Sequence, residues 1–141
     1  MGHNNLSNWY FRIAMCWILV GVALGIVMAA THDHTLFPAH THINLLGWVT
    51  MGIFAFFYRL WPAAAATKLA KIQFWIYAPA HFVQMVTLTM MLRGNAAIEP
   101  VLAIASMVVG VAFLMFVVNA WKFTAAPAAA ATQPVGTTAA G

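Results

Sequence analysis

The chain has 141 residues, of which 64% are hydrophobic and only 6% are charged, and its formal net charge is +4. A soluble domain carries about a quarter charged residues, so this composition excludes the soluble globular class and indicates one integral membrane domain. The few charges lie near the ends of apolar segments, where they bear on membrane orientation and give no indication of nucleic-acid binding. Cys16 is the only cysteine, which excludes an internal disulfide and a thiolate-rich metal site.

Four segments are long and apolar enough to cross ~30 Å of hydrocarbon, which takes roughly 20 residues. They cover about residues 9–30, 39–61, 72–92 and 98–123. Together they predict an all-α domain over residues 1–124, an integral membrane four-helix up-down bundle. Residues 125–141 are rich in alanine, proline, threonine and glycine and carry no charge, so we expect a disordered tail.

The basic residues are unevenly distributed along the chain. If both termini are cytoplasmic, only Arg93 lies outside, and the cytoplasmic side carries Arg12, Arg59, Lys68, Lys71 and Lys122. The positive-inside rule therefore predicts a multi-pass protein of a bacterial-type inner (plasma) membrane, with both termini in the cytoplasm. Small residues at Gly21 and Gly25, and at Ser106 and Gly110, are spaced for close helix approach, and we expect a homo-oligomer, a dimer or a trimer.

Four of the six histidines fall within eleven residues, at the outer end of the second apolar segment. Imidazole at a membrane boundary is a candidate functional group, and neutral imidazole is the commonest metal ligand. With the one aspartate between them, these side chains offer up to five nitrogen or oxygen ligands, a set that suits zinc or copper. The alternative is a solvated polar loop. The candidate metal ligands are His32, Asp33, His34, His40 and His42.

His40 and His42 are two residues apart, which on a helix is roughly 200° of rotation, so only one of them is expected to face into the bundle. His40 shares its side with Asn44 and Gly47, and this side is polar and small enough to admit a flat cofactor. His42 shares its side with larger apolar residues. The sequence leaves the choice between the two open.

His81 is the deepest ionisable side chain, near the middle of the third apolar segment. It is a candidate ligand of haem iron or another metal; the alternatives are a neutral histidine bonded to Gln84 or a neighbouring helix, and a proton relay. At 1.5 Å per residue, His81 lies ~18 Å below Arg93, whereas His42 lies only ~6 Å below Pro38. A shared haem therefore requires tilt, a kink, or ligands from two subunits.

The string His-Thr-His-Ile-Asn-Leu-Leu-Gly-Trp-Val, which begins at His40 and is followed by Tyr58 and Pro62, resembles the second transmembrane helix of haem–copper oxidase and nitric-oxide reductase catalytic subunits (subunit I). The likeness covers about residues 11–62. It implies that His40, or His42 in the alternative register, is an axial ligand of a low-spin haem near the outer surface. Later helices of that family carry the remaining haem and copper ligands, and their motifs have no match here. The resemblance thus implies only the front end of that fold, with His81 as a replacement ligand.

We therefore expect a small membrane protein that binds haem b through His40, His42 and His81, for electron transfer or binding of a diatomic gas. The alternatives are a zinc- or copper-binding protein at the periplasmic face and a non-catalytic assembly subunit. No paired carboxylates or activated nucleophile indicate catalytic residues, so any reaction would be oxidoreductase chemistry of the cofactor. The enzymatic activity and the redox partner stay open.

Overall fold

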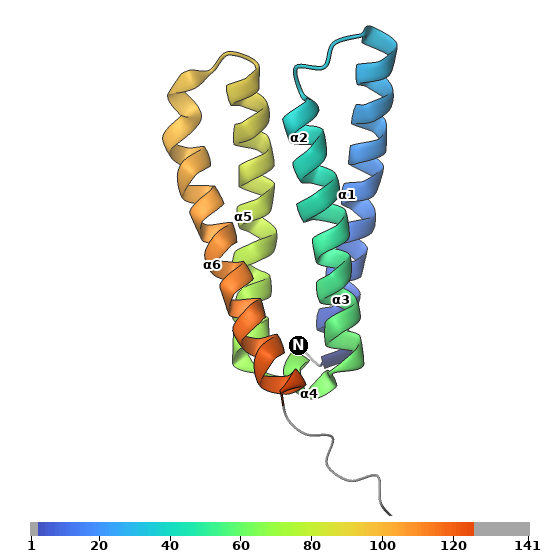
Figure 1. The fold of residues 1–141 in the computed structure, drawn as a ribbon, viewed down its shortest axis with the longest axis vertical. Helices are drawn as coiled ribbons and strands as arrows, with labels where there is room; N and C mark the ends of the chain where they lie inside the picture. The colour runs from blue at the N-terminus through green and yellow to red at the C-terminus, as the bar shows by residue number, and fades with distance from the viewer. Residues whose placement is uncertain (1–2, 126–141) are drawn as a thin grey trace, which may run out of the picture.

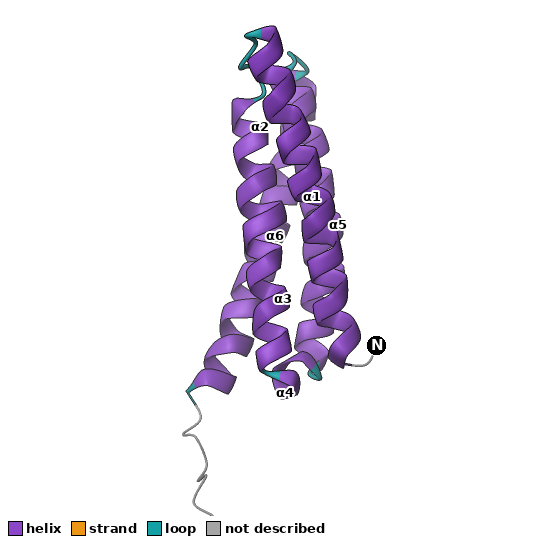
Figure 2. Cartoon of the chain, turned by 90° about the vertical axis from the view of Figure 1, so that its right-hand side faces the viewer, coloured by secondary structure: helices purple, strands orange, loops and turns teal. Residues whose placement is uncertain are grey.

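The computed structural model describes residues 3–125, and every regular element within that range is a helix. In chain order these are α1 (His3–Thr31), α2 (Phe37–His42), the π-helix η1 (Ile43–Thr50), α3 (Met51–Leu60), α4 (Pro62–Ala65), α5 (Lys68–Leu92), the short 3-10 helix η2 (Ala96–Ile98) and α6 (Glu99–Thr124). Figures 1 and 2 show α1, the α2–η1–α3 stretch, α5 and α6 side by side along the long axis, with α4 at one end. The predicted all-α class is confirmed. The predicted tail, apart from Ala125, lies outside the described residues.

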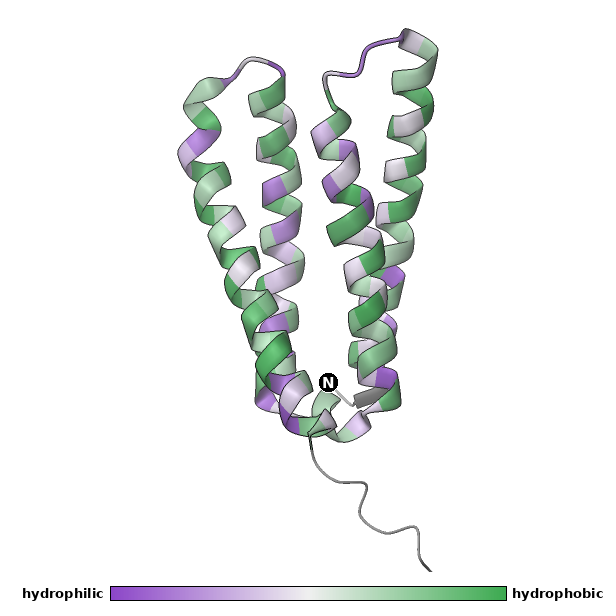
Figure 3. Cartoon of the chain, in the orientation of Figure 1, coloured by the Kyte–Doolittle hydropathy of each residue, from purple (hydrophilic) through white to green (hydrophobic). Residues whose placement is uncertain are grey.

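Three helical stretches are long and apolar enough to cross a membrane, Asn5–Thr31, Phe37–Leu60 and Ala96–Thr124. The fourth expected span, α5, is 25 residues long but more polar, because Gln73, His81, Gln84 and Thr87 are buried along it. Many large apolar side chains are exposed along the long helices, and Figure 3 shows that apolar residues predominate along the length of these helices. Such an extended apolar surface is rare on soluble monomers, whereas a protein in contact with lipid requires an apolar exterior.

Local sequence explains where α2 and α5 begin. Pro38 lies in the first turn of α2, where its missing N–H is one of the donors that a helix start leaves unpaired. The Thr67 hydroxyl accepts a hydrogen bond from the Ala70 N–H (3.1 Å) and caps α5. This cap starts α5 at Lys68, before the expected residue 72. At the other end, Gly94 takes a positive φ of 98° in the predicted turn to α6.

The chain folds as two helical hairpins, because most close contacts are made between α1 and α2–η1–α3 and between α5 and α6. Glycines bring α1 and η1 together. A Cβ added at Gly47 would lie only 2.6 Å from the Trp17 side chain, and a Cβ added at Gly21 would overlap the Asn44 amide. The small residues of α1 therefore support helix packing within the chain.

A buried network of polar side chains joins the two hairpins near α4. Tyr10 and Tyr58 both donate a hydrogen bond to Oε1 of Gln73. The Asn119 amide donates to the Tyr58 hydroxyl (3.5 Å) and to the Ala64 carbonyl (3.2 Å). Because these four side chains come from α1, α3, α5 and α6, and each is at most 2% exposed, the network connects all the long helices at this end.

Candidate functional site

His81 is fully buried on α5, and its two ring nitrogens have different surroundings. Nδ1 lies 3.3 Å from Oε1 of Gln84, and Nε2 of Gln84 donates to the Ser106 hydroxyl (3.0 Å). Since Oε1 is only an acceptor, this arrangement places the imidazole proton on Nδ1. Nε2 of His81 is buried and has no hydrogen-bond partner within residues 3–125. The structure thus positions an imidazole whose Nε2 lone pair is unused.

Two aromatic rings fix the plane of the His81 imidazole. Trp17 meets it edge-on, with 4.9 Å between ring centroids, and Tyr77 stacks on it at 6.0 Å with 22° between the planes. The Tyr77 hydroxyl donates to the Leu46 carbonyl (3.0 Å) in η1. π-helical turns shift the backbone relative to an α-helix and occur often at functional sites. Here the π-helix provides the carbonyl that holds Tyr77, and through it the histidine ring.

His42 ends α2, and its imidazole is arranged in a similar way. Its Nδ1 lies 2.7 Å from the Pro38 carbonyl, which makes Nδ1 the donor. The ring makes no other hydrogen bond within the described part of the chain, and the side chain is exposed. The next residue, Ile43, packs in one cluster with Met85 of α5, one turn beyond His81. The structure therefore brings His42 and His81 into one neighbourhood.

The predicted difference in depth between His42 and His81, ~12 Å at 1.5 Å per residue, is larger than the structure gives. It assumed that Pro38 and Arg93 lie at the same level, but the loop after α1 descends, so that α2 begins below the outer end of α5 (Figure 1). Ala39 and Ile43 pack against residues of α5 one to two turns beyond His81, namely Met85 and Leu88. Leu46 is level with Tyr77, one turn before His81. The contacts with Met85 and Leu88 place His42 about one or two helical turns beyond His81, whereas the Tyr77 bond places the two histidines at a similar level, so they differ in depth by at most about two turns.

His40 faces α1, and its ring packs against that helix at Gly25. The Asn44 amide nitrogen lies 3.5 Å from its Nδ1 and 3.1 Å from its Nε2, and a Cβ added at Gly25 would lie 3.0 Å from the ring. The expectation that the side shared by His40, Asn44 and Gly47 admits a flat cofactor is wrong, because α1 fills that space. His40 is half-buried in helix packing, whereas His42 leaves one nitrogen free.

His32, Asp33 and His34 are exposed in the loop between α1 and α2. The Asp33 carboxylate accepts hydrogen bonds from the Thr35 hydroxyl (2.6 Å) and the Thr35 N–H (2.9 Å), which lower the pKa of Asp33 below its usual value. Within residues 3–125, no three or more histidine, cysteine or acidic side chains come together in a group that could hold a metal ion. The five predicted zinc or copper ligands are therefore not assembled into one such group.

Several residues of the site were not predicted from the sequence. Trp17 was not singled out, although it contacts His81 and also lies against Gly47, where α1 and η1 pack together. Gln73 and Asn119, which join the hairpins, were also missed; a buried amide in an apolar helix was the signal that could have found them. No family model matches the chain, and neither a curated protein nor a solved structure matches it.

Proposed function

We propose that this chain is a small integral membrane protein that binds b-type haem, with His42 and His81 as the two axial ligands. The observation that supports the proposal is that the two imidazoles have the same hydrogen-bond arrangement. Each has its Nδ1 against a protein oxygen and its Nε2 without a partner in the described residues. Histidines that ligate metals almost always donate their other ring N–H in this way, because the bond fixes the tautomer and the orientation of the ring.

Electron transfer is the function that this ligand pair favours. Haem supplies one-electron redox chemistry when it is bound, and the protein adjusts it through the axial ligands, hydrogen bonding and burial. If His42 and His81 both held the haem iron, no position on the iron would be left for a diatomic gas. Gln84 keeps the proton of His81 on Nδ1, and Trp17 and Tyr77 hold the ring in place.

His40 is not a ligand in this proposal, although the family resemblance allows it. Its two nitrogens face the Asn44 amide, and its ring lies against α1 at Gly25. Zinc or copper binding through the outer loop is not favoured, because residues 3–125 bring together no group of three or more histidine, cysteine or acidic side chains that could hold a metal ion. A non-catalytic assembly subunit would need no unpaired buried imidazole, which is costly in hydrocarbon.

The proposed placement is a four-helix up-down bundle in a bacterial-type inner membrane, with both termini in the cytoplasm. Near α4, the helix ends carry four basic residues, Arg59, Lys68, Lys71 and Lys122. The opposite end carries both acidic residues and only one basic residue. By the positive-inside rule, the α4 end is cytoplasmic, and the histidines lie toward the periplasm. The polar residues of α5 that would oppose its insertion are buried, which supports α5 as the fourth span.

The proposed oligomer is a dimer or a trimer. Gly110 supplies an exposed small residue on α6, and a Cβ there would meet nothing within 4 Å. Such a position allows close approach of a helix from another subunit. The haem ligands proposed above both come from one chain, so the proposed haem site does not require the oligomer.

Haem titration of detergent-purified protein tests the proposed function. We expect the wild type to develop a Soret band when an equimolar amount of haem is added to the protein. His42→Ala and His81→Ala are each expected to weaken haem binding on the order of 100-fold, at least as much as loss of a residue that supports a metal ligand. His40→Ala is the matched control and should bind as the wild type does. A wild type without Soret absorbance refutes the proposal, and loss of binding in His40→Ala but not in His42→Ala assigns the ligand to His40 instead.

A further inference from the structure

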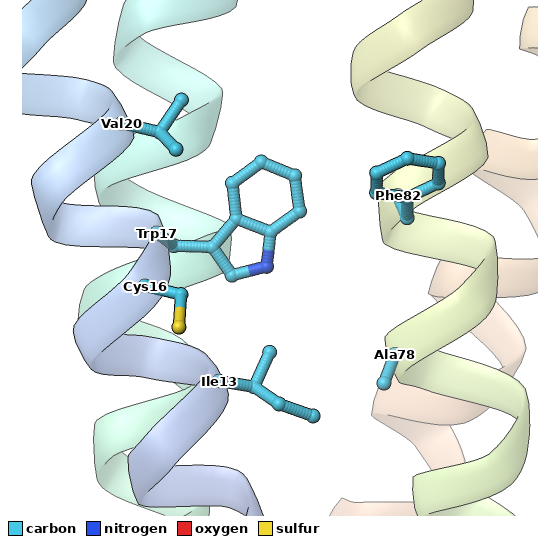
Figure 4. A pocket seen from close by; sticks show the side chains of 6 residues that line it. All are labelled: Ile13, Cys16, Trp17, Val20, Ala78 and Phe82. Atoms are coloured by element: carbon cyan, nitrogen blue, oxygen red, sulfur yellow. The ribbon is translucent and has the colours of Figure 1, made fainter.

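A second feature of the membrane-facing exterior is a hollow between α1 and α5. It has a volume of about 320 Å³, and it is lined by Ile13, Cys16, Trp17, Val20, Ala78 and Phe82 (Figure 4). The volume is at the lower end of the range for small-molecule sites, which are mostly apolar with a few polar groups that fix orientation. Here the lining is apolar except for the Cys16 thiol and the Trp17 indole N–H.

The Trp17 indole N–H is a donor without an acceptor. It makes no hydrogen bond within residues 3–125. In Figure 4 the indole nitrogen lies on the edge of the ring that faces the space between Trp17 and the α5 residues Ala78 and Phe82. Tryptophan N–H groups usually find a partner when they are removed from water, because an unpaired donor in hydrocarbon is costly. The hollow therefore presents one unmet hydrogen-bond donor.

The depth of Trp17 restricts what can supply the acceptor. Trp17 stands midway between His3 and Thr31, the two ends of α1. With α1 across the membrane as proposed, this position is near the bilayer midplane, about 15 Å from the phospholipid headgroups. The acyl chains at that depth have no acceptor. The occupant must itself be soluble in hydrocarbon and carry a hydrogen-bond acceptor into the middle of the membrane.

We propose that this hollow is a binding site for a lipid-soluble quinone. A quinone has a flat ring, carbonyl oxygens that accept a hydrogen bond, and an apolar tail that keeps it at this depth. The Trp17 N–H donates to one carbonyl, and the rings of Trp17 and Phe82, whose centroids are 6.3 Å apart, border the quinone ring. This hydrogen bond from the Trp17 N–H to a quinone carbonyl orients the quinone ring in the otherwise apolar hollow. The site also lies next to the haem site proposed above, because Trp17 contacts His81.

Binding of a decyl-substituted benzoquinone to the purified protein in lipid nanodiscs tests the proposal. Trp17→Phe keeps an aromatic ring but removes the donor, and we expect the dissociation constant to rise about fivefold, as for loss of one hydrogen bond. Ala78→Leu fills the hollow and should weaken binding about tenfold or more. Ala103→Leu makes the same change on the exposed side of α6, away from the hollow, and should bind as the wild type does.

His42→Ala separates this proposal from the haem proposal, because it removes a proposed haem ligand but no residue that lines the hollow. We expect His42→Ala to bind the quinone as the wild type does, whether or not haem binds to either protein. Equal quinone binding by Ala78→Leu and the wild type overturns the quinone site. So does disulfide cross-linking of two chains through Cys16 without any quinone binding, which assigns the hollow to contact with a second copy.

Discussion

The two ends of this bundle use buried polar side chains differently. At the α4 end, hydrogen bonds run between the hairpins, from Tyr10 and Tyr58 to Gln73. At the histidine end, the bonds of His42 and His81 stay within one hairpin each, and the Nε2 of each ring has no hydrogen-bond partner among residues 3–125. A polar network that links helices is expected to contribute stability, whereas free imidazole nitrogens contribute none. The α4 end thus has side-chain hydrogen bonds that hold the hairpins together, and the other end has the histidines of the proposed haem site.

Gln73→Leu is expected to have the largest effect on stability. It removes the acceptor shared by the Tyr10 and Tyr58 hydroxyls and leaves both buried without that partner. We expect the free energy of unfolding in detergent to fall by about 2–3 kcal/mol. Haem affinity should not change, since Gln73 belongs to the other end. Chemical denaturation and haem titration of one preparation measure both, and a large loss of haem affinity would contradict the division between the two ends.

Gly47→Ala tests the seam between α1 and η1, which supports Trp17 beside His81. The added Cβ would lie 2.6 Å from Trp17, so that side chain must move, and we expect a loss of about 1–2 kcal/mol in thermal or chemical unfolding. Gly52→Ala is the matched control, because nothing lies within 4 Å of a Cβ added there. It should leave stability unchanged or raise it by up to about 1 kcal/mol. Equal effects of the two changes would show that the seam is not tightly packed.

Gln84→Leu tests whether orientation of His81 matters to binding. It removes the acceptor at Nδ1 and the bond to Ser106, while the imidazole itself stays. We expect haem affinity to fall about tenfold and the haem midpoint potential to shift. Gln84→Glu keeps an acceptor at that position and should retain more of the affinity. If Gln84→Leu alters unfolding but not affinity or potential, Gln84 has only a packing role.

The smallest effect is expected from the exposed outer loop. Hydrogen bonds from Thr35 lower the pKa of Asp33, so the stability that they contribute is present above the usual carboxyl pKa of 3.8. It is lost as the pH falls through the lower pKa of the folded state. Asp33→Asn should therefore differ slightly from the wild type near neutral pH and converge with it in acid. NMR titration of the Asp33 carboxyl measures the pKa, and a value above 3.8 would contradict the assignment.

The sequence predicted the helices well because each apolar segment is determined locally by its own length and composition. It predicted His42 and His81 as candidates because imidazole is rare in hydrocarbon. Their difference in depth was predicted too large, since it depends on how far the loop before Phe37 descends along α1. That path is determined by packing between helices, which no count along the chain reveals. The π-helix η1 was also missed, and the local pattern does not specify that its Leu46 carbonyl accepts a hydrogen bond from Tyr77 of another helix.

Some partners of the histidines were predicted only in part. Gln84 was recognised as a neighbour because it shares a helix face with His81, at a separation of three residues. Its bond to Ser106 joins two helices, and nothing in the local pattern specifies that pairing. Gly21 and Gly25 indicated close approach of helices, but the pattern did not specify that α2 and η1 of the same chain are the partners.

Electron paramagnetic resonance of the ferric haem complex tests the central claim most directly, because it distinguishes the axial ligands. Protein loaded with haem is predicted to give the low-spin signal of iron with two imidazole ligands, and this signal should persist in His40→Ala and disappear in His42→Ala and His81→Ala. A high-spin signal in the wild type, or a low-spin signal that survives His81→Ala, would contradict the assignment of His42 and His81 as the haem ligands.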